Sequence, residues 1–319
     1  MIRVENLTRR YGSHQALAGL SFHVGKGEIV GFLGPNGAGK TTAMRILTCF
    51  LPPTSGRAAV AGFDVFSEPM EVRRRVGYMP ESVPLYPEMR VREYLDYRAR
   101  LKRVPRSLRR ARVDRVIERC DVGDFQRRLI GALSKGMRQR VGLADALVHE
   151  PPILILDDPT AGLDPNQIRE VRALVRELGR EHTVVLSTHI LPEAEVTCGR
   201  VVILSRGRVI AEDTPDGLRR MLERRGRLRV ALSGADDAAL RERLGKVDGV
   251  ALVEPAGQPG VFLVEAAPDR DVRESVFRAA VEGGLVLLEL SPLGASLEDV
   301  FVEITTREVA DAAPEEAGA

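Results

Sequence analysis

The chain has 319 residues, of which 44% are apolar, and its formal net charge is only +2 at neutral pH. This length suits one large domain with a smaller one, and the small net charge excludes a strong general attraction to nucleic acid or to an anionic membrane. The three cysteines lie far apart and fit neither a metal site nor a disulfide framework, so we expect reduced thiols in a cytosolic protein. We expect neither a signal peptide nor a membrane-spanning segment, because no apolar run approaches about 20 residues.

Strands and helices alternate along the first two thirds of the sequence. In chain order, the pattern predicts strands at 2–4, 16–24 and 28–33, helices at 40–51, 92–102 and 108–119, a strand at 153–156, a helix at 167–178, and strands at 184–186, 201–204 and 209–211. Such alternation favours an α/β fold with a mostly parallel sheet. The helical block between 85 and 147 is an insertion into that fold, and we interpret its arginines as a solvated helix face.

A second pattern begins after Arg224-Arg225-Gly226. Strands are predicted at 228–232, 250–253, 261–265 and 285–290, and helices at 236–244 and 271–281. This βαββαβ order suggests a small α+β unit of the ferredoxin-like type. A last helix is predicted at 297–304, before a tail rich in Ala, Glu and Pro. The predicted domains are therefore 1–224, with a helical subdomain at about 85–147, an accessory domain at 225–305, and a disordered tail at 306–319.

The loop after the strand at 28–33 has the pattern G-x-x-x-x-G-K-[ST], in the form Gly34-Pro35-Asn36-Gly37-Ala38-Gly39-Lys40-Thr41. Its glycines let successive N–H groups point at phosphate oxygens, and the positive end of the following helix adds to the attraction. Lys40 can reach the β- and γ-phosphates, and the Thr41 hydroxyl can bind Mg²⁺. This loop, continued by Thr42, predicts a nucleotide triphosphate site.

The most informative segment runs from Leu133 to Asp164. It opens with a short polar motif that contains a glycine, Leu133-Ser134-Lys135-Gly136-Met137-Arg138-Gln139, and a helical stretch follows. The apolar run at 153–156 comes next and ends in Asp157 and Asp158. An apolar strand that ends in a carboxylate is typical of sites for magnesium-bound nucleotides, and Asp157 directly ends this one.

Together these motifs resemble those of the ATP-binding cassette (ABC) family of ATPases, from about residue 1 to 220. The matching segments are the phosphate loop, the signature motif at Ser134 to Gln139 with Lys135 where glycine is commoner, the D-loop Ala161-Gly162-Leu163-Asp164, the switch-histidine segment Ser187-Thr188-His189, the adenine-stacking position Tyr11, and Gly77-Tyr78-Met79-Pro80-Glu81 at the place of the glutamine loop. The resemblance implies a P-loop NTPase cassette, with a RecA-like mixed sheet core and a helical subdomain, to which the ferredoxin-like unit is appended.

The resemblance also implies a function, a Mg²⁺-dependent ATPase in which two cassettes pair head to tail and hold two ATP molecules between them. The roles it implies are catalysis for Asp158, His189 and Lys40, ATP binding for Tyr11 and for 34–42, Mg²⁺ binding for Thr41, Asp157 and Glu81, contact with the nucleotide of the other chain for Ser134, Lys135, Gly136 and Gln139, and a D-loop role for Asp164. One chain alone would then carry only half of each site.

Two residues depart from the family pattern. Glu81 stands where glutamine is usual, and it can still bind Mg²⁺ because hard cations accept either side-chain oxygen. Asp158 stands where most members have a glutamate that polarises the attacking water. The aspartate side chain is one methylene shorter, and it either supports ordinary turnover or slows hydrolysis. Slow hydrolysis would arise because a misplacement of about 1 Å can cost on the order of 10²-fold in rate.

The leading hypothesis is the ATPase subunit of an ABC transporter, paired with a separate membrane permease at the cytoplasmic face of the membrane. The ending Ser296-Leu297-Glu298-Asp299-Val300-Phe301 resembles ATPases of multidrug and gliding-motility-type export permeases. The alternatives are an ABC ATPase that acts on ribosomes or DNA, and a nucleotide switch that hydrolyses slowly. We expect a homodimer and no nucleic acid partner. The sequence identifies neither the cargo, nor the permease, nor the role of the accessory domain.

Overall fold

The computed structural model describes residues 1–188, 190–223, 226–267, 270–292 and 301. It divides into two compact units, Met1–Pro215 and Asp216–Ala319, each of which is described by itself. The division falls within the helix α8 (Pro215–Glu223), whereas the sequence pattern places the boundary after that helix. Except for Phe301, the helix expected at 297–304 and the tail at 306–319 lie outside the described residues. None of the described helices is long and apolar enough to cross a membrane.

The first unit is built on a six-stranded sheet, as far as the described residues show, in the order β10-β9-β3-β8-β7-β6. Neighbouring strands from β9 to β6 are parallel, and only β10 runs antiparallel to its neighbour. Its strands are β3 (Ile29–Leu33), β6 (Val76–Met79), β7 (Ile153–Asp157), β8 (Thr183–Ser187), β9 (Arg200–Ser205) and β10 (Arg208–Asp213). The predicted strands are thus present, and their parallel arrangement brings their carboxyl ends to one edge.

A second sheet lies beside the first, and the sequence pattern does not predict it. It is antiparallel, in the order β2-β1-β4-β5, and consists of β1 (Ile2–Tyr11), β2 (His14–Val24), β4 (Ser55–Val60) and β5 (Phe63–Asp64). The two sheets share an apolar core with the helix α1 (Lys40–Leu47), and Phe22 meets Phe32 edge to face across it with ring centroids 4.8 Å apart. The sequence pattern does not reveal this second sheet, because periodicity does not show which strands pair.

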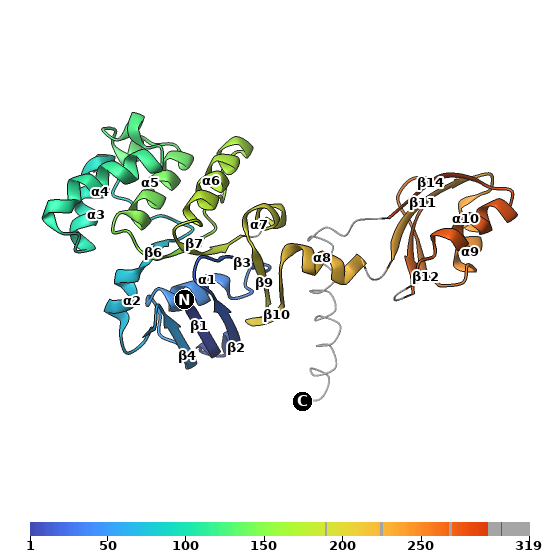
Figure 1. The fold of residues 1–319 in the computed structure, drawn as a ribbon, viewed down its shortest axis with the longest axis horizontal. Coiled ribbons are helices and arrows are strands. Elements are labelled where there is room, and N and C mark those ends of the chain that lie inside the picture. Colours follow the sequence, from blue (N-terminus) through green and yellow to red (C-terminus); the bar gives the residue numbers. More distant parts are fainter. Residues whose placement is uncertain (189, 224–225, 268–269, 293–300, 302–319) are drawn as a thin grey trace. The chain divides into compact units, whose positions relative to one another are not determined.

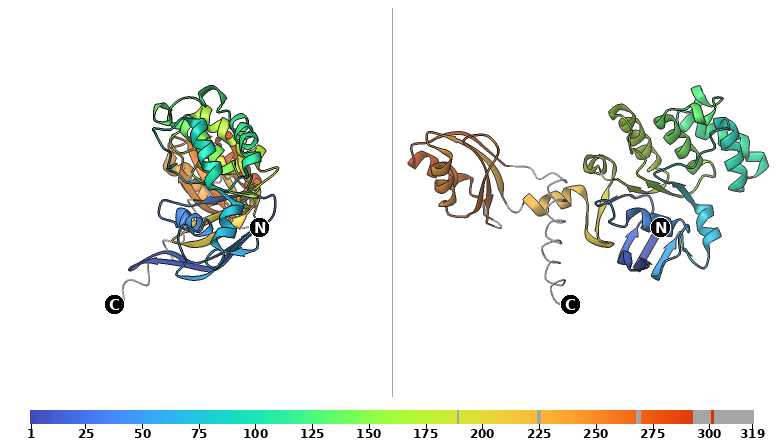
Figure 2. Two further views of the ribbon diagram at one scale, coloured as in Figure 1. Left: turned by 90° about the vertical axis from the view of Figure 1, so that its left-hand side faces the viewer. Right: turned by 180° about the vertical axis from the view of Figure 1, so that it is seen from behind.

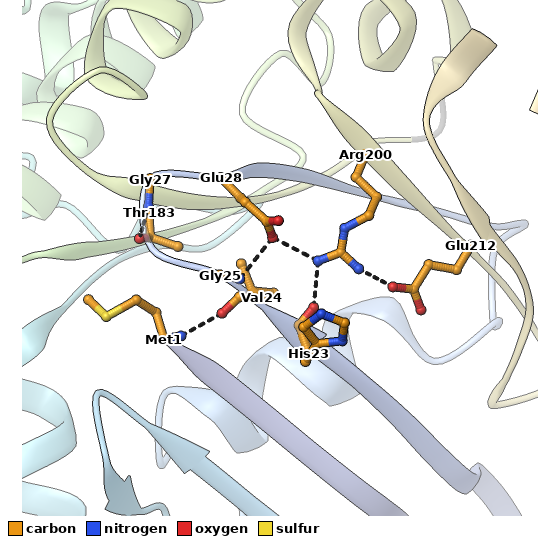
Figure 3. A network of polar contacts seen from close by, with 9 residues as sticks. All are labelled: Met1, His23, Val24, Gly25, Gly27, Glu28, Thr183, Arg200 and Glu212. Atoms are coloured by element: carbon orange, nitrogen blue, oxygen red, sulfur yellow. Dashed lines mark hydrogen bonds and ion pairs between the residues drawn. The ribbon is translucent and has the colours of Figure 1, made fainter. Parts of the chain in front are cut away.

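A polar network centred on Arg200 also joins the two sheets (Figure 3). Its guanidinium binds Glu28 at 2.7 Å, donates to the carbonyl of His23 in β2 at 2.7 Å, and pairs with Glu212 of β10. Burial raises the pKa of Glu28, but Arg200 and the Gly25 N–H outweigh it, so the pKa is lowered overall. The network ties Glu28, just before β3, to β2 and β10, and β3 leads directly into the phosphate loop.

The helix α1 is shorter than predicted, since it ends at Leu47 instead of near Leu51. The chain leaves the helix because Cys49 takes a left-handed conformation with φ of 58°. The N–H groups of Phe50 and Leu51 then both donate to the carbonyl of Arg45. The turn thus ends the helix before the Pro52-Pro53 pair is reached.

The helices α3 (Val91–Leu101), α4 (Arg106–Arg119) and α5 (Lys135–Leu147) form one lobe, away from β1, β2 and β4 (Figures 1 and 2). Asp145 of α5 is buried in this lobe, and its carboxylate pairs with Arg98 at 2.9 Å and Lys102 at 3.1 Å. Burial raises the pKa of Asp145, but the two cations outweigh it and hold the pKa below its usual range. The remaining helices are α2 (Pro69–Arg75), α6 (Pro165–Leu178) and α7 (Leu191–Thr197).

His149 makes the stability of this unit depend on pH. Its Nε2 donates to the carbonyl of Val76 at 3.1 Å, and burial together with the charge of Lys102 lowers its pKa to about 3. The folded pKa lies below the ordinary value, so the unfolded chain binds the proton more readily and the free energy of unfolding falls as pH drops below about 6.5. Between pH 7 and pH 5 we expect a loss of about 2 kcal/mol from this group.

Urea unfolding of the chain and of His149→Gln at both pH values measures that loss, since glutamine can donate to Val76 but does not titrate. The parent is expected to lose about 2 kcal/mol more than the variant between pH 7 and pH 5. Equal losses in the two proteins would show that His149 is protonated in the folded state.

The second unit has the element order βαββαβ after α8. Its strands β11 (Arg227–Ser233), β12 (Val250–Pro255), β13 (Val261–Ala266) and β14 (Val286–Pro292) form an antiparallel sheet in the order β12-β13-β11-β14. The helices α9 (Asp237–Gly245) and α10 (Arg273–Glu282) contribute Leu240, Leu244 and Val276 to its apolar core. This unit has a core of its own.

Candidate functional site

A cavity of about 370 Å³ lies at the carboxyl edge of the parallel sheet. In open α/β sheets this edge is the usual place for ligands. The phosphate loop follows β3 there, and Asp157 at the end of β7 is paired in register with Ser187 at the end of β8. The residues that line the cavity are Tyr11, His14, Ala16, Asn36, Gly37, Ala38, Gly39, Lys40, Thr41, Thr42, Glu81, Asp157, Asp158 and Ser187.

Two glycines of the loop are required by close backbone contacts. A Cβ on Gly34 would lie 2.5 Å from the carbonyl oxygen of Leu204. Gly39 has a φ of 102°, and a Cβ there would lie 2.6 Å from the carbonyl oxygen of Ala16. Because these two residues have no Cβ, the loop can pass close to β2 and β9 before the chain enters α1. Its N–H groups and the positive end of α1 then meet at the cavity.

Lys40, the first residue of α1, is only 9% exposed. Its Nζ donates to the carbonyls of Gly34 at 2.5 Å and Pro35 at 3.0 Å, so the lysine stays folded back over the loop. Burial lowers the pKa of Lys40, while the charges of Asp158, Asp157 and Glu81 oppose that shift. Gly34 and Pro35 contribute these carbonyls but are not among the residues that line the cavity.

Asp157 has one carboxylate oxygen engaged and one without a partner. Its Oδ1 accepts hydrogen bonds from Ser187 Oγ at 2.6 Å and from Thr41 Oγ1 at 3.4 Å. Its Oδ2 is buried and has no hydrogen-bond partner among the described residues. A buried anionic oxygen beside a threonine hydroxyl fits a hard divalent cation. The residues present thus fit Mg²⁺, although no three His, Cys, Asp or Glu side chains in the described part of the chain gather as a metal site.

Asp158 follows with a strained backbone, since its φ of 51° lies in the left-handed region. Its N–H is held by the hydroxyl of Ser187 at 2.9 Å and by the carbonyl of the same residue at 3.2 Å. This conformation turns the side chain toward the cavity, which Asp158 lines together with Glu81 from the loop after β6. Strain of this kind is commonly kept at functional sites.

Two side chains from the hairpin of β1 and β2 also line the cavity. Tyr11 is 42% exposed, and the guanidinium of Arg9 lies 4.7 Å from the centre of its ring. Arg9 is fixed in turn by donating to the carbonyl of Pro52 at 2.9 Å. His14 also lines the cavity, although the sequence pattern gives it no motif context. The hairpin of β1 and β2 brings His14 to the cavity. In the sequence, the only sign of this position is that His14 lies two residues after Gly12.

The signature residues lie elsewhere in the same chain and do not reach this cavity. Ser134 caps α5 by accepting from the N–H of Met137 at 3.3 Å. Ser134 and Gly136 line a separate cavity of about 250 Å³. Gln139 is buried, and Asp164 caps α6 by accepting from the N–H groups at 166 and 167. His189 lies outside the described residues.

The chain matches one family model over part of its length and several curated proteins over nearly its whole length. The family model described as "ABC transporter" matches residues 17–161. A daunorubicin resistance ATP-binding protein of Streptomyces coeruleorubidus is 38% identical over 95% of this chain and 95% of its own length. A bacitracin transport ATP-binding protein of Bacillus licheniformis is 34% identical, with 95% of this chain and 97% of that protein covered. A Nod factor export ATP-binding protein of Burkholderia thailandensis is 36% identical, with 97% and 98% covered.

The fold has close counterparts among solved structures. One is the dimeric post-hydrolysis state of an ATP-binding cassette bound to ADP and Pi, with a TM-score of 0.62 and 27% identity. It covers 67% of this chain and 98% of its own chain. This structural likeness covers about two thirds of this chain, whereas the curated relatives match nearly its whole length.

Proposed function

We propose that this chain, which belongs to the ABC transporter family and is an ATPase of that family, drives export through a separate membrane permease. The observation that carries the ATP-driven mechanism of this proposal is the division of the chain's functional residues, while the direction of transport rests on the relatives named above. The phosphate loop and the paired aspartates share one cavity, while the signature motif stands apart in the same chain. A signature motif that does not reach the phosphate loop of its own chain can contact a nucleotide only when two chains pair.

The cavity supplies each element that ATP hydrolysis needs. The N–H groups of the phosphate loop, the positive end of α1 and the Lys40 ammonium would hold the phosphates. The ring of Tyr11, backed by Arg9, offers an aromatic face for adenine. Asp158 would orient and polarise the attacking water, with His189 as the sensor of the γ-phosphate. Preorganised charges of this kind lower the barrier without rearranging during the reaction.

Mg²⁺ is the second component of the proposed site. Thr41, Asp157 and, from the loop after β6, Glu81 would hold it, and phosphate oxygens and water would supply its remaining ligands. When bound, it would neutralise charge that develops on the phosphates. The partner-free Oδ2 of Asp157 supports this assignment, since an unpaired buried carboxylate oxygen is otherwise costly.

A second copy of the chain would complete the site. The Ser134 hydroxyl and the N–H groups at the start of α5 would meet the γ-phosphate of ATP bound to the other copy, near Lys135, Gly136 and Gln139. ATP would then act as a ligand of the closed dimer, and hydrolysis would release it.

The permease would bind at a cavity of about 790 Å³ between the helical lobe and the loop that carries Glu81. Lys102 from the lobe and Ser82 from that loop both line it, so a partner seated there touches the residue that follows Glu81, which itself lines the nucleotide cavity. Its cations are Arg45, Arg73, Arg74, Arg98, Lys102 and Arg103, opposed by Asp145. Phe50 and Leu101 add apolar area and are 70% and 54% exposed. We therefore expect an acidic permease segment with at least one large apolar side chain.

Export is the direction that the named relatives support. Their names refer to daunorubicin resistance, bacitracin transport and Nod factor export, and these proteins are 34–38% identical to this chain. Because relatives of similar identity carry different cargo names, we propose that the permease, and not this subunit, selects the cargo. This subunit would lie at the cytoplasmic face of the membrane, held there by the permease.

Copurification from membranes tests the permease assignment. A tagged form of the chain, extracted from membranes of its own cells in mild detergent, should bring down a membrane protein that raises its ATP turnover. Arg73→Glu combined with Arg74→Glu should lose that protein while turnover of the free subunit is unchanged. Recovery of ribosomal or DNA-repair proteins, with no membrane protein, would favour the alternative class.

Replacing Asp158 by glutamate tests whether this chain hydrolyses slowly. The longer side chain should move the carboxylate about 1 Å closer to the water, so we expect turnover to rise severalfold, within an upper bound of about 10²-fold. Phosphate release at saturating ATP measures the effect. An unchanged or lower rate would mean that aspartate is already well placed and would remove the slow-switch alternative.

A further inference from the structure

The connection between α3 and α4 carries a dense run of positive charge. The residues between Asp96 and Asp114 include no acidic side chain, and their cations are Arg98, Arg100, Lys102, Arg103, Arg106, Arg109, Arg110 and Arg112. The two helices lie side by side at the end of the helical lobe that is farther from α6 (Figures 1 and 2). From the sequence alone we interpret the arginines as a solvated helix face, and ion pairs in the structure account for only part of them.

Ion pairs within the lobe neutralise one part of this charge. The pairs are Arg98 and Lys102 with Asp145, Arg100 with Asp96, and Arg112 with Glu150. These side chains stabilise the lobe itself, and the remaining cations of the run need a different account.

The remaining cations have no close carboxylate partner. Among the described residues Arg103 and Arg106 form no ion pair, and Arg109 donates only to a backbone carbonyl, at 3.1 Å. The Nε of Arg110 lies 4.0 Å from Asp114 and the arginine side chain is 91% exposed, so this pair contributes little. We call Arg103, Arg106, Arg109 and Arg110 the basic patch.

The helix itself gives no reason for these cations. Arg106, Arg109 and Arg110 are spaced three and four residues apart, so they project from one side of the first turns of α4. Arg106 is the first residue of α4, where the positive helix end disfavours a cation, and the first turn has no acidic residue. Arg103 precedes Arg106 by three residues, which limits their Cα separation to about 11 Å. The patch therefore gathers positive charge that the described part of the protein does not compensate.

The basic patch borders the cavity proposed for the permease. Arg103 and Leu101 line that cavity, whereas Arg106, Arg109 and Arg110 line none of the cavities described above. The positive charge thus continues from the cavity onto a surface outside it. A pocket favours a folded segment that fits it, whereas an open basic surface suits small mobile anions that pair with each guanidinium separately.

We infer that the basic patch binds anionic lipid headgroups at the cytoplasmic surface of the membrane. The inference rests on the proposed function, because the neighbouring cavity would seat a permease that is itself embedded in that membrane. Residues beside such a cavity lie close to the headgroups, and lipid phosphates pair well with guanidinium groups. Screening limits the attraction to about 8 Å, so a local patch can act although the net charge of the chain is only +2.

The basic patch would give the subunit a second, weaker attachment to the membrane. Each cation near an anionic membrane surface strengthens binding about fivefold. The patch would therefore hold the subunit reversibly, close to a permease that it binds through the separate cavity. The two attachments reinforce each other, because the first raises the effective concentration for the second.

Cosedimentation with lipid vesicles tests the inference. The full chain should pellet with vesicles of equal parts phosphatidylglycerol and phosphatidylcholine, not with phosphatidylcholine alone, and added salt should release it. Arg106→Gln combined with Arg110→Gln should weaken vesicle binding about 25-fold, which is about fivefold for each charge. Arg106→Lys combined with Arg110→Lys should bind within about twofold of the parent, because lysine keeps the charge although it loses the planar fork.

Arg176→Gln combined with Arg180→Gln is the matched control. It removes two exposed arginines with the same spacing, one in the last turn of α6 and one just after that helix. This variant should bind vesicles as the parent does. Thermal melting checks that every variant is folded.

Three results would contradict the account of this surface or of the subunit. Equal binding to both kinds of vesicle, or an equal loss in the control variant, would overturn the inference. If Arg106→Gln with Arg110→Gln bound vesicles normally but lost the permease in detergent, the patch would belong to a protein partner and the inference would fall. A parent that recovers no membrane protein from detergent extracts would instead overturn the proposed function, whatever the vesicles show.

Discussion

Lys40→Met is expected to reduce ATP turnover by at least about 10²-fold and to weaken ATP binding by roughly tenfold or more. The lysine contributes a nearly buried cation that faces Asp157, Asp158 and Glu81 across the cavity. Without it, the phosphates would add negative charge to a site that already holds three carboxylates, and water cannot screen that repulsion well there. Fluorescent-nucleotide titration and phosphate release measure the two effects.

Lys26→Met is the matched control, since Lys26 is exposed and outside the cavity. It should leave both measurements unchanged. Lys40→Met also leaves the carbonyls of Gly34 and Pro35 without their donor, so circular dichroism and thermal melting must confirm that the variant is folded. A folded variant with turnover near that of the parent would contradict the role given to Lys40.

Asp158→Asn is expected to lower turnover by about 10²- to 10⁴-fold, the range that a general base contributes, while ATP still binds. The amide has nearly the same size as the carboxylate, and the backbone of residue 158 stays held by Ser187. The change therefore removes the base with little alteration of the cavity. Single-turnover hydrolysis separates this loss from any change in ATP affinity.

Asp157→Asn provides the contrast, because we assign that residue to Mg²⁺ instead of to water. Its effect should depend on Mg²⁺ concentration and be partly relieved when the metal is raised. The effect of Asp158→Asn should not respond to the metal. The opposite pattern would exchange the roles of the two aspartates.

The sequence predicts the core of the fold because its signals are local. The G-x-x-x-x-G-K-[ST] loop and the apolar run that ends in Asp157 each lie within a few residues, and the structure brings both to one cavity. The family assignment follows from the order of such motifs and is confirmed by relatives that match 95% of the chain. The βαββαβ order of the second unit was also predictable, since each element has its own periodicity.

Features that depend on contacts between distant segments could not be predicted. Separate strands at 2–4 and 16–24 gave no sign that they form a second sheet with β4 and β5. His14 reaches the cavity only because the hairpin of β1 and β2 folds over the phosphate loop. Lys135 looked like a simple departure from glycine, and its seat on Gly162 emerges only when α5 is packed against the D-loop.

The requirement for two chains is the central claim, and sedimentation of Asp158→Asn tests it most directly. With Mg²⁺ and ATP this variant should sediment as a dimer, and without nucleotide as a monomer. Adding Ser134→Arg should prevent the dimer while ATP binding persists, because the signature motif would no longer fit the nucleotide of the other copy. A monomer with ATP bound in Asp158→Asn, or a dimer that forms regardless of Ser134, would contradict the account.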